Sequence, residues 1–165
     1  RSRKIRNHYF FQCREIEGHK AFAVPVEESW RIHNESQKGL SGIEKSRFAM
    51  STEWGKMEVM SIMDTPDLAA LTKDLPADAA KLVTALFGEG LIFFKMLRSP
   101  HGAETQGQLI IAKRNPNALW ISGYEDRIIY DGRKETGDKY TGLEGLFASL
   151  FANAVESQEK VLEAA

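Results

Sequence analysis

Three kinds of feature are scarce in this chain of 165 residues, and each scarcity excludes a class of protein. Cys13 is the single cysteine, which excludes an internal disulfide and a cysteine-based zinc site. No apolar run approaches the roughly 20 residues that span a bilayer, so we expect no membrane partner. The 22 basic residues nearly cancel the 23 acidic ones, so the overall charge does not indicate a polyanionic partner.

Recognisable catalytic motifs are also missing. Gly88 and Gly90 lack the spacing and the following Lys-Ser/Thr of a phosphate-binding loop, and the four histidines stand at no metal-ligand spacing from one another. Cys13 falls in a predicted strand, where a lone cysteine is typical of a small buried hydrophobe, so we expect it to do no chemistry. The sequence therefore favours a protein that is not an enzyme and needs no cofactor or metal.

The hydrophobic pattern runs twice through one cycle of short strands followed by helix. In the first cycle, about 9–87, alternation predicts strands at 8–13, 20–26, 43–50 and 56–63, and helical segments starting at Pro66 and Pro76. In the second, about 91–162, strands are predicted at 91–97, 108–113, 118–124 and 127–131, followed by a helix over 142–162. We therefore expect an α+β fold, with two repeats of a four-stranded antiparallel sheet followed by helix, in a single domain covering 1–165.

The two ends of the chain carry their own signals. Residues 1–7 form a basic arm without acidic residues, which is either the end of an organellar presequence or an arbitrary starting point. The low cysteine content fits a reducing compartment, and we expect a mitochondrial or other organellar matrix.

The last predicted helix has an apolar stripe wide enough for its own sheet and a second chain, which predicts an oligomer interface at Leu143, Leu146, Phe147, Leu150 and Phe151.

Basic and aromatic side chains are interleaved along several of the predicted strands. Such a surface suits single-stranded nucleic acid, because rings stack on unpaired bases at about 1–3 kcal/mol each and cations follow the phosphates. A ring on a strand is equally typical of the hydrophobic core. A cation at a strand end often extends into solvent and has no binding role. The candidate contact residues are Lys20, Phe22, Arg47, Lys56, Lys95, Arg98, Lys113, Trp120 and Arg127.

Four short segments resemble a known family. Residues 18–24 (GHKAFAV) are similar to its K-G-K-A-A-L-S-V strand, and residues 63–71 (MDTPDLAAL) to its strand-to-helix corner, L-S-P-T-E-x-G-x-L. Residues 93–95 (FFK) stand where the family has F-F-H, and residues 140–144 (YTGLE) resemble V-T-K-A-E at the start of its last helix. The pattern, over about 18–162, resembles the Whirly family of single-stranded-DNA-binding proteins of plant organelles and the related kinetoplastid mitochondrial guide-RNA-binding proteins.

The resemblance implies two packed four-stranded sheets, with four chains assembled through helical contacts into a tetramer of one chain or of the chain and a paralogue. It also implies binding of single-stranded DNA or RNA with little sequence preference. Two alternatives stay open on the sequence alone. One is a structural subunit of a large organellar assembly, which the near-neutral charge favours, and the other is an unrecognised small-molecule enzyme.

Overall fold

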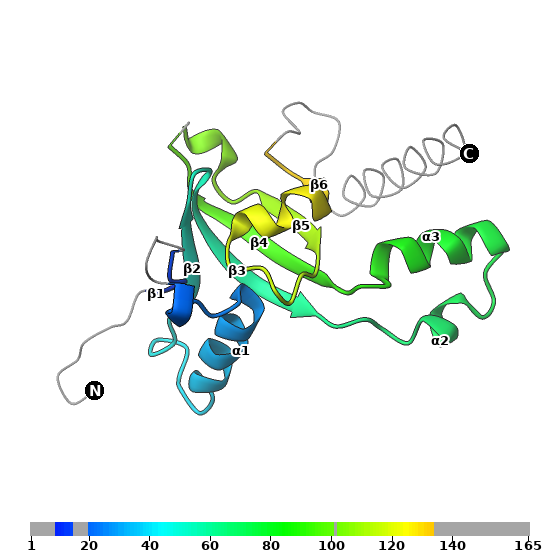
Figure 1. Ribbon diagram of the computed structural model, residues 1–165, viewed down its shortest axis with the longest axis horizontal. Helices are drawn as coiled ribbons and strands as arrows, with labels where there is room; N and C mark the ends of the chain where they lie inside the picture. The colour runs from blue at the N-terminus through cyan, green and yellow to red at the C-terminus, as the bar shows by residue number, and fades with distance from the viewer. Residues whose placement is uncertain (1–8, 15–19, 101, 134–165) are drawn as a thin grey trace.

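The computed structural model describes residues 9–14, 20–100 and 102–133, and these form an α+β structure around one sheet (Figure 1). Three short 3₁₀ segments lie among the helices and strands. In chain order the elements are β1 (Tyr9–Phe11), η1 (Lys20–Phe22), α1 (Val26–Ser36), β2 (Arg47–Thr52), β3 (Gly55–Met63), α2 (Leu68–Thr72), α3 (Ala77–Phe87), β4 (Leu91–Arg98), η2 (Ala103–Thr105), β5 (Leu109–Lys113), η3 (Ile121–Arg127) and β6 (Ile128–Asp131).

The sheet has six strands in the order β1 to β6, so neighbours in sequence are also neighbours in space. Strand β1 pairs with β2 in parallel, and the other four pairs are antiparallel. The described residues thus form one mixed sheet, and the expected two separate four-stranded antiparallel sheets are not confirmed. The predicted helix over 142–162, with its five interface residues, lies outside the described residues.

One face of the sheet carries the hydrophobic core. Side chains of alternate strand residues, among them Met50, Met57 and Phe94, are buried on this face. Helix α1 packs against it through Val26, and η3 adds Tyr124, whose ring meets Phe94 edge to face with centroids 5.4 Å apart. The opposite face of the sheet carries polar side chains of the same strands, such as Glu58 and Lys95, together with the buried apolar residues Leu91 and Ile111.

Most predicted strands are confirmed. Alternation of polar and apolar residues over a short segment indicates a strand with one buried face. Strands β3, β4, β5 and β6 match the predictions within a few residues, β1 lies inside the predicted 8–13, and β2 begins later than the predicted 43. The helical predictions from Pro66 and Pro76 are confirmed by α2 and α3. In α2 the Asp67 side chain accepts a hydrogen bond from the Ala70 N–H at 3.1 Å, which caps the helix.

Two predicted strands are wrong. Residues 20–26 contain η1 and the start of α1, and residues 118–124 contain the start of η3. In the first case Pro25 stands at the N-cap of α1 and Glu27 and Glu28 lie in its first turn, which are helix-start signals. In the second case Trp120 is only 9% exposed, because its ring is buried in the core without joining a strand ladder.

Candidate nucleic-acid interface

The register of the sheet places Lys113 and four other predicted contact residues on the face opposite the core, and these four are neighbours. Glu58 pairs with Ala49 on one side and with Lys95 on the other, so these three side chains share a face. Arg47 lies two residues before Ala49, and Lys56 two residues before Glu58, so both point the same way. Arg98 stands opposite Lys56.

Two aromatic rings of β1 lie beside these cations. Tyr9 pairs with Arg47 and Phe11 pairs with Ala49, so both rings belong to the same face. The Lys56 ammonium lies 4.5 Å from the Tyr9 ring centroid and 4.9 Å from that of Phe11. We call this surface the basic–aromatic face, and it consists of Tyr9, Phe11, Arg47, Lys56, Lys95 and Arg98.

The basic–aromatic face has an excess of positive charge. Arg47 lies 3.7 Å from the Glu58 carboxylate, a partly exposed pair worth about 0–1 kcal/mol. Lys56, Lys95 and Arg98 have no ion-pair partner within the part of the chain that the structure describes. Next to the pair lies an open hollow of about 550 Å³, lined in part by Tyr9, Arg47 and Lys95. The basic–aromatic face therefore presents cations and aromatic rings next to an open hollow.

The remaining predicted contacts are not part of the basic–aromatic face. Lys113 and Arg127 both form ion pairs with Glu89, so one carboxylate partly neutralises two cations. Trp120 is buried in the core and its ring is not accessible for stacking, which corrects its prediction as a contact. Phe22 in η1 is 77% exposed, and Lys20 begins the same element.

Sequence analysis missed the rings of β1 as contact residues. Tyr9 and Phe11 fall in the predicted strand at 8–13, and their spacing of two residues places them on one face of it. That alternation was the available signal, but only the parallel pairing of β1 with β2 puts the rings next to Arg47. Cys13 follows β1 and is exposed, so the expectation that it is buried is wrong.

A buried charged network holds α1 against the end of β5. Glu27 accepts hydrogen bonds from Arg114 Nε at 2.8 Å and from the Asn115 backbone N–H at 2.9 Å, and Asp64 also contacts Arg114. Burial opposes the charge of Arg114, but Glu27 and Asp64 keep its pKa above the usual value. Burial, and then the charge of Glu27, raise the pKa of the Tyr124 phenol. This network positions elements and lies outside the basic–aromatic face.

The described residues contain neither a metal-binding cluster nor a membrane-spanning helix. Within 9–14, 20–100 and 102–133, no three His, Cys, Asp or Glu side chains are grouped so that they could hold a metal ion. No helix among those residues is both long enough and apolar enough to cross a bilayer.

Comparisons with known proteins assign no family. No protein-family model matches the chain, and no solved structure matches it. A curated protein of Aquifex aeolicus (strain VF5) named "Putative L-lysine 2,3-aminomutase" is 28% identical to this chain over 122 residues. The match covers 73% of this chain and 26% of that protein, so the chain spans about a quarter of the length of the curated relative it matches. The resemblance to the Whirly family stays a prediction.

Proposed function

We propose that this chain binds single-stranded DNA or RNA, with little sequence preference, on the basic–aromatic face. The observation that carries the proposal is that cations from β2, β3 and β4 and two rings from β1 share one sheet face. Neighbouring strands lie about 4.8 Å apart, so the cations form a path across the sheet. A strand of nucleic acid on this path would meet phosphate-binding groups and stacking groups together.

Stacking of a base on Tyr9 or Phe11 is stronger than the cation–π contacts that Lys56 now makes with these rings. An exposed cation–π contact such as those of Lys56 is worth about 0.5–1 kcal/mol, whereas a base stacked on a ring gains about 1–3 kcal/mol. Lys56 has a flexible stem, so its ammonium can leave the rings and bind a phosphate. Stacking reads no base edge, so we expect little sequence preference.

The test measures the affinity of labelled single-stranded oligonucleotides by fluorescence anisotropy at several salt concentrations. Lys56→Ala and Lys95→Ala should each reduce the slope of log affinity against log salt by about 0.7, because each removes one phosphate contact. Lys81→Ala on the exposed surface of α3 is the matched control and should leave the slope unchanged. Equal slopes for all three variants, or no binding by the wild-type chain, would refute the proposal. DNA and RNA of one sequence are compared in the same assay.

A second candidate function is contact with another protein, as a subunit or module of an assembly. Helices α2 and α3 pack on each other and extend away from the sheet (Figure 1), and Leu71 and Leu75 are exposed on this unit. The Aquifex protein is about four times longer than its matched part, which fits a module within a larger protein. A Leu71→Ser and Leu75→Ser double variant should then lower the mass measured by light scattering and leave oligonucleotide affinity unchanged. An unchanged mass would show that Leu71 and Leu75 do not join copies of this chain.

A further inference from the structure

A second recess lies where strands β2 and β3 separate. Their antiparallel pairing ends at Ala49 and Glu58, although β2 begins two residues earlier, at Arg47, and β3 continues to Met63. On the other side of the gap, the register of β3 shifts between Val59 and Ser61. Trp30 of α1 closes the inner end of the gap, since its indole N–H donates to the Val59 carbonyl at 3.1 Å.

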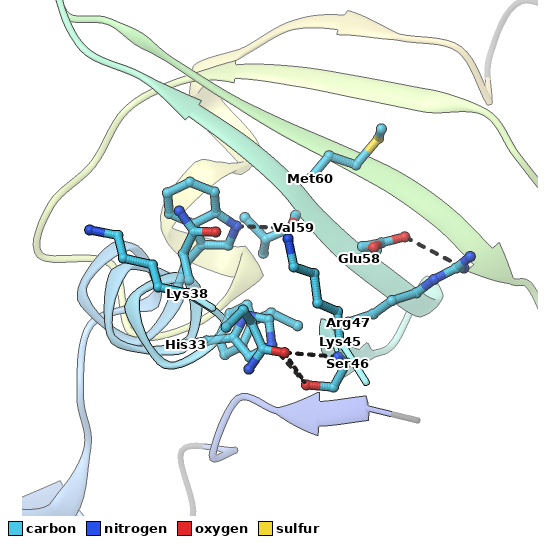
Figure 2. Close-up of a pocket in the computed structure, with 12 residues that line it drawn as sticks. His33, Lys38, Lys45, Ser46, Arg47, Glu58, Val59 and Met60 are labelled. Atoms are coloured by element: carbon cyan, nitrogen blue, oxygen red, sulfur yellow. Dashed lines mark hydrogen bonds and ion pairs between the residues drawn. The ribbon is translucent and has the colours of Figure 1, made fainter. Parts of the chain in front are cut away.

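The recess holds about 270 Å³ and is lined by α1, by the segment leading into β2 and by β3 (Figure 2). Its wall carries three cations, Lys38, Lys45 and Arg47, and one carboxylate, Glu58. Glu58 lies near Arg47, and Lys38 lies 2.7 Å from the Glu35 carboxylate outside the recess. Lys45 has no ion-pair partner among the described residues, so the recess has an unneutralised positive charge.

A hydrogen-bonded floor holds these cations in place. The Ser46 N–H donates to the Gln37 side-chain oxygen at 2.9 Å, and the Ser46 hydroxyl lies 3.1 Å from His33 Nε2. His33 is held between two phenyl rings, and burial lowers its pKa, so it is neutral at pH 7 and adds no charge. Because Ser46 points to the floor, its neighbours Lys45 and Arg47 extend away from it, as Figure 2 shows.

The size and the charge of the recess select its ligand. Pockets for drug-sized ligands hold about 300–1,000 Å³, so this recess suits a compact group more than a whole nucleotide. A terminal phosphate monoester carries a charge of about −1.5 to −2 at pH 7, as a phosphorylated side chain does, whereas each phosphate within a strand carries one charge. An unneutralised lysine beside an arginine favours the more highly charged group.

The recess borders the basic–aromatic face, because Arg47 lines both this recess and the hollow beside Tyr9 and Lys95. We propose that the gap between β2 and β3 binds the terminal phosphate of a nucleic-acid strand that lies on the basic–aromatic face. This inference rests on the proposed function. It assigns to Lys45 the recognition of a strand end, and to Arg47 the contact that joins the end to the rest of the strand.

The experiment uses three oligonucleotides of one sequence, with a 5′-phosphate, a 3′-phosphate or hydroxyls at both ends. One of the two terminal phosphates should increase the affinity of the wild-type chain about tenfold, as expected for a hydrogen-bonded charge pair. Lys45→Ala should remove this preference and keep the affinity for the unphosphorylated strand within about twofold. Lys81→Ala is again the control and should keep the preference.

Inorganic phosphate separates the two possible sources of the ligand. Its titration is followed at the Trp30 indole N–H in ¹H–¹⁵N spectra of the wild-type chain and of Lys45→Ala. Equal affinity for the three oligonucleotides would overturn the terminal-phosphate site and leave the proposed function standing. Failure of every oligonucleotide to bind would overturn both, and a phosphate-induced shift of Trp30 that needs Lys45 would then assign the recess to a free phosphate or a phosphorylated small molecule. If phosphate shifts the Trp30 signal equally in the wild-type chain and in Lys45→Ala, the recess binds an adventitious ion only.

Discussion

Glu27 offers the sharpest test of how this chain is held together. Its carboxylate is 1% exposed and accepts hydrogen bonds from Arg114 Nε and from the Asn115 N–H. Glu27→Ala removes both acceptors and leaves a buried guanidinium and a buried backbone N–H without their partner. Breaking a buried ion pair costs about 3–5 kcal/mol. Arg114 keeps its contact with Asp64, so we expect a value near the lower limit, about 3 kcal/mol.

Thermal unfolding followed by circular dichroism measures this cost. For a domain of this size 1 kcal/mol corresponds to about 2–4 °C, so Glu27→Ala should lower the Tm by about 6–12 °C. The matched control is Glu28→Ala, which removes an exposed carboxylate from the same turn of α1 and should change the Tm little. Glu27→Gln keeps an acceptor for the Asn115 N–H, so its Tm should lie between those of Glu27→Ala and Glu28→Ala. Equal Tm values for Glu27→Ala and Glu28→Ala would refute the described network.

Three further predictions concern single residues. Lys20→Ala should weaken binding nearly equally for all sequences and reduce the salt slope by about 0.7, and an unchanged slope in the folded variant would remove Lys20 from the interface. Cys13→Ser should leave oligonucleotide affinity unchanged, because the chain has no second cysteine to pair with it; lost binding by a folded variant would contradict this. Because burial lowers the pKa of His33 in the folded chain, its neutral form contributes stability that is complete above the unfolded pKa of about 6.5 and is lost as the pH falls below it. His33→Gln should therefore lessen the decrease of Tm between pH 7 and pH 5, and an unaltered decrease would show that other groups cause it.

The sequence by itself determined the elements whose signals are local. Strands β3 to β6 follow from alternation, and α2 and α3 from proline starts and a capping acid, because each pattern records which side chains a few neighbouring residues bury. The same reasoning failed at 20–26 and 118–124. There Val26, Trp120 and Tyr124 are also buried, but by packing of a helix start and a 3₁₀ turn over the sheet, and alternation does not distinguish that burial from the burial of a strand.

The candidate site needed the tertiary structure. The sequence named Arg47, Lys56 and Lys95 as cations on strands, but only the strand register puts them on one face, because a shift of one residue would turn a side chain to the core. The rings of β1 reach that face through a parallel pairing with β2 between residues far apart in sequence. The recess at Lys45 lies where the pairing of β2 with β3 ends at Ala49 and Glu58. The point at which two strands stop pairing depends on contacts between residues far apart in sequence, which no local pattern records.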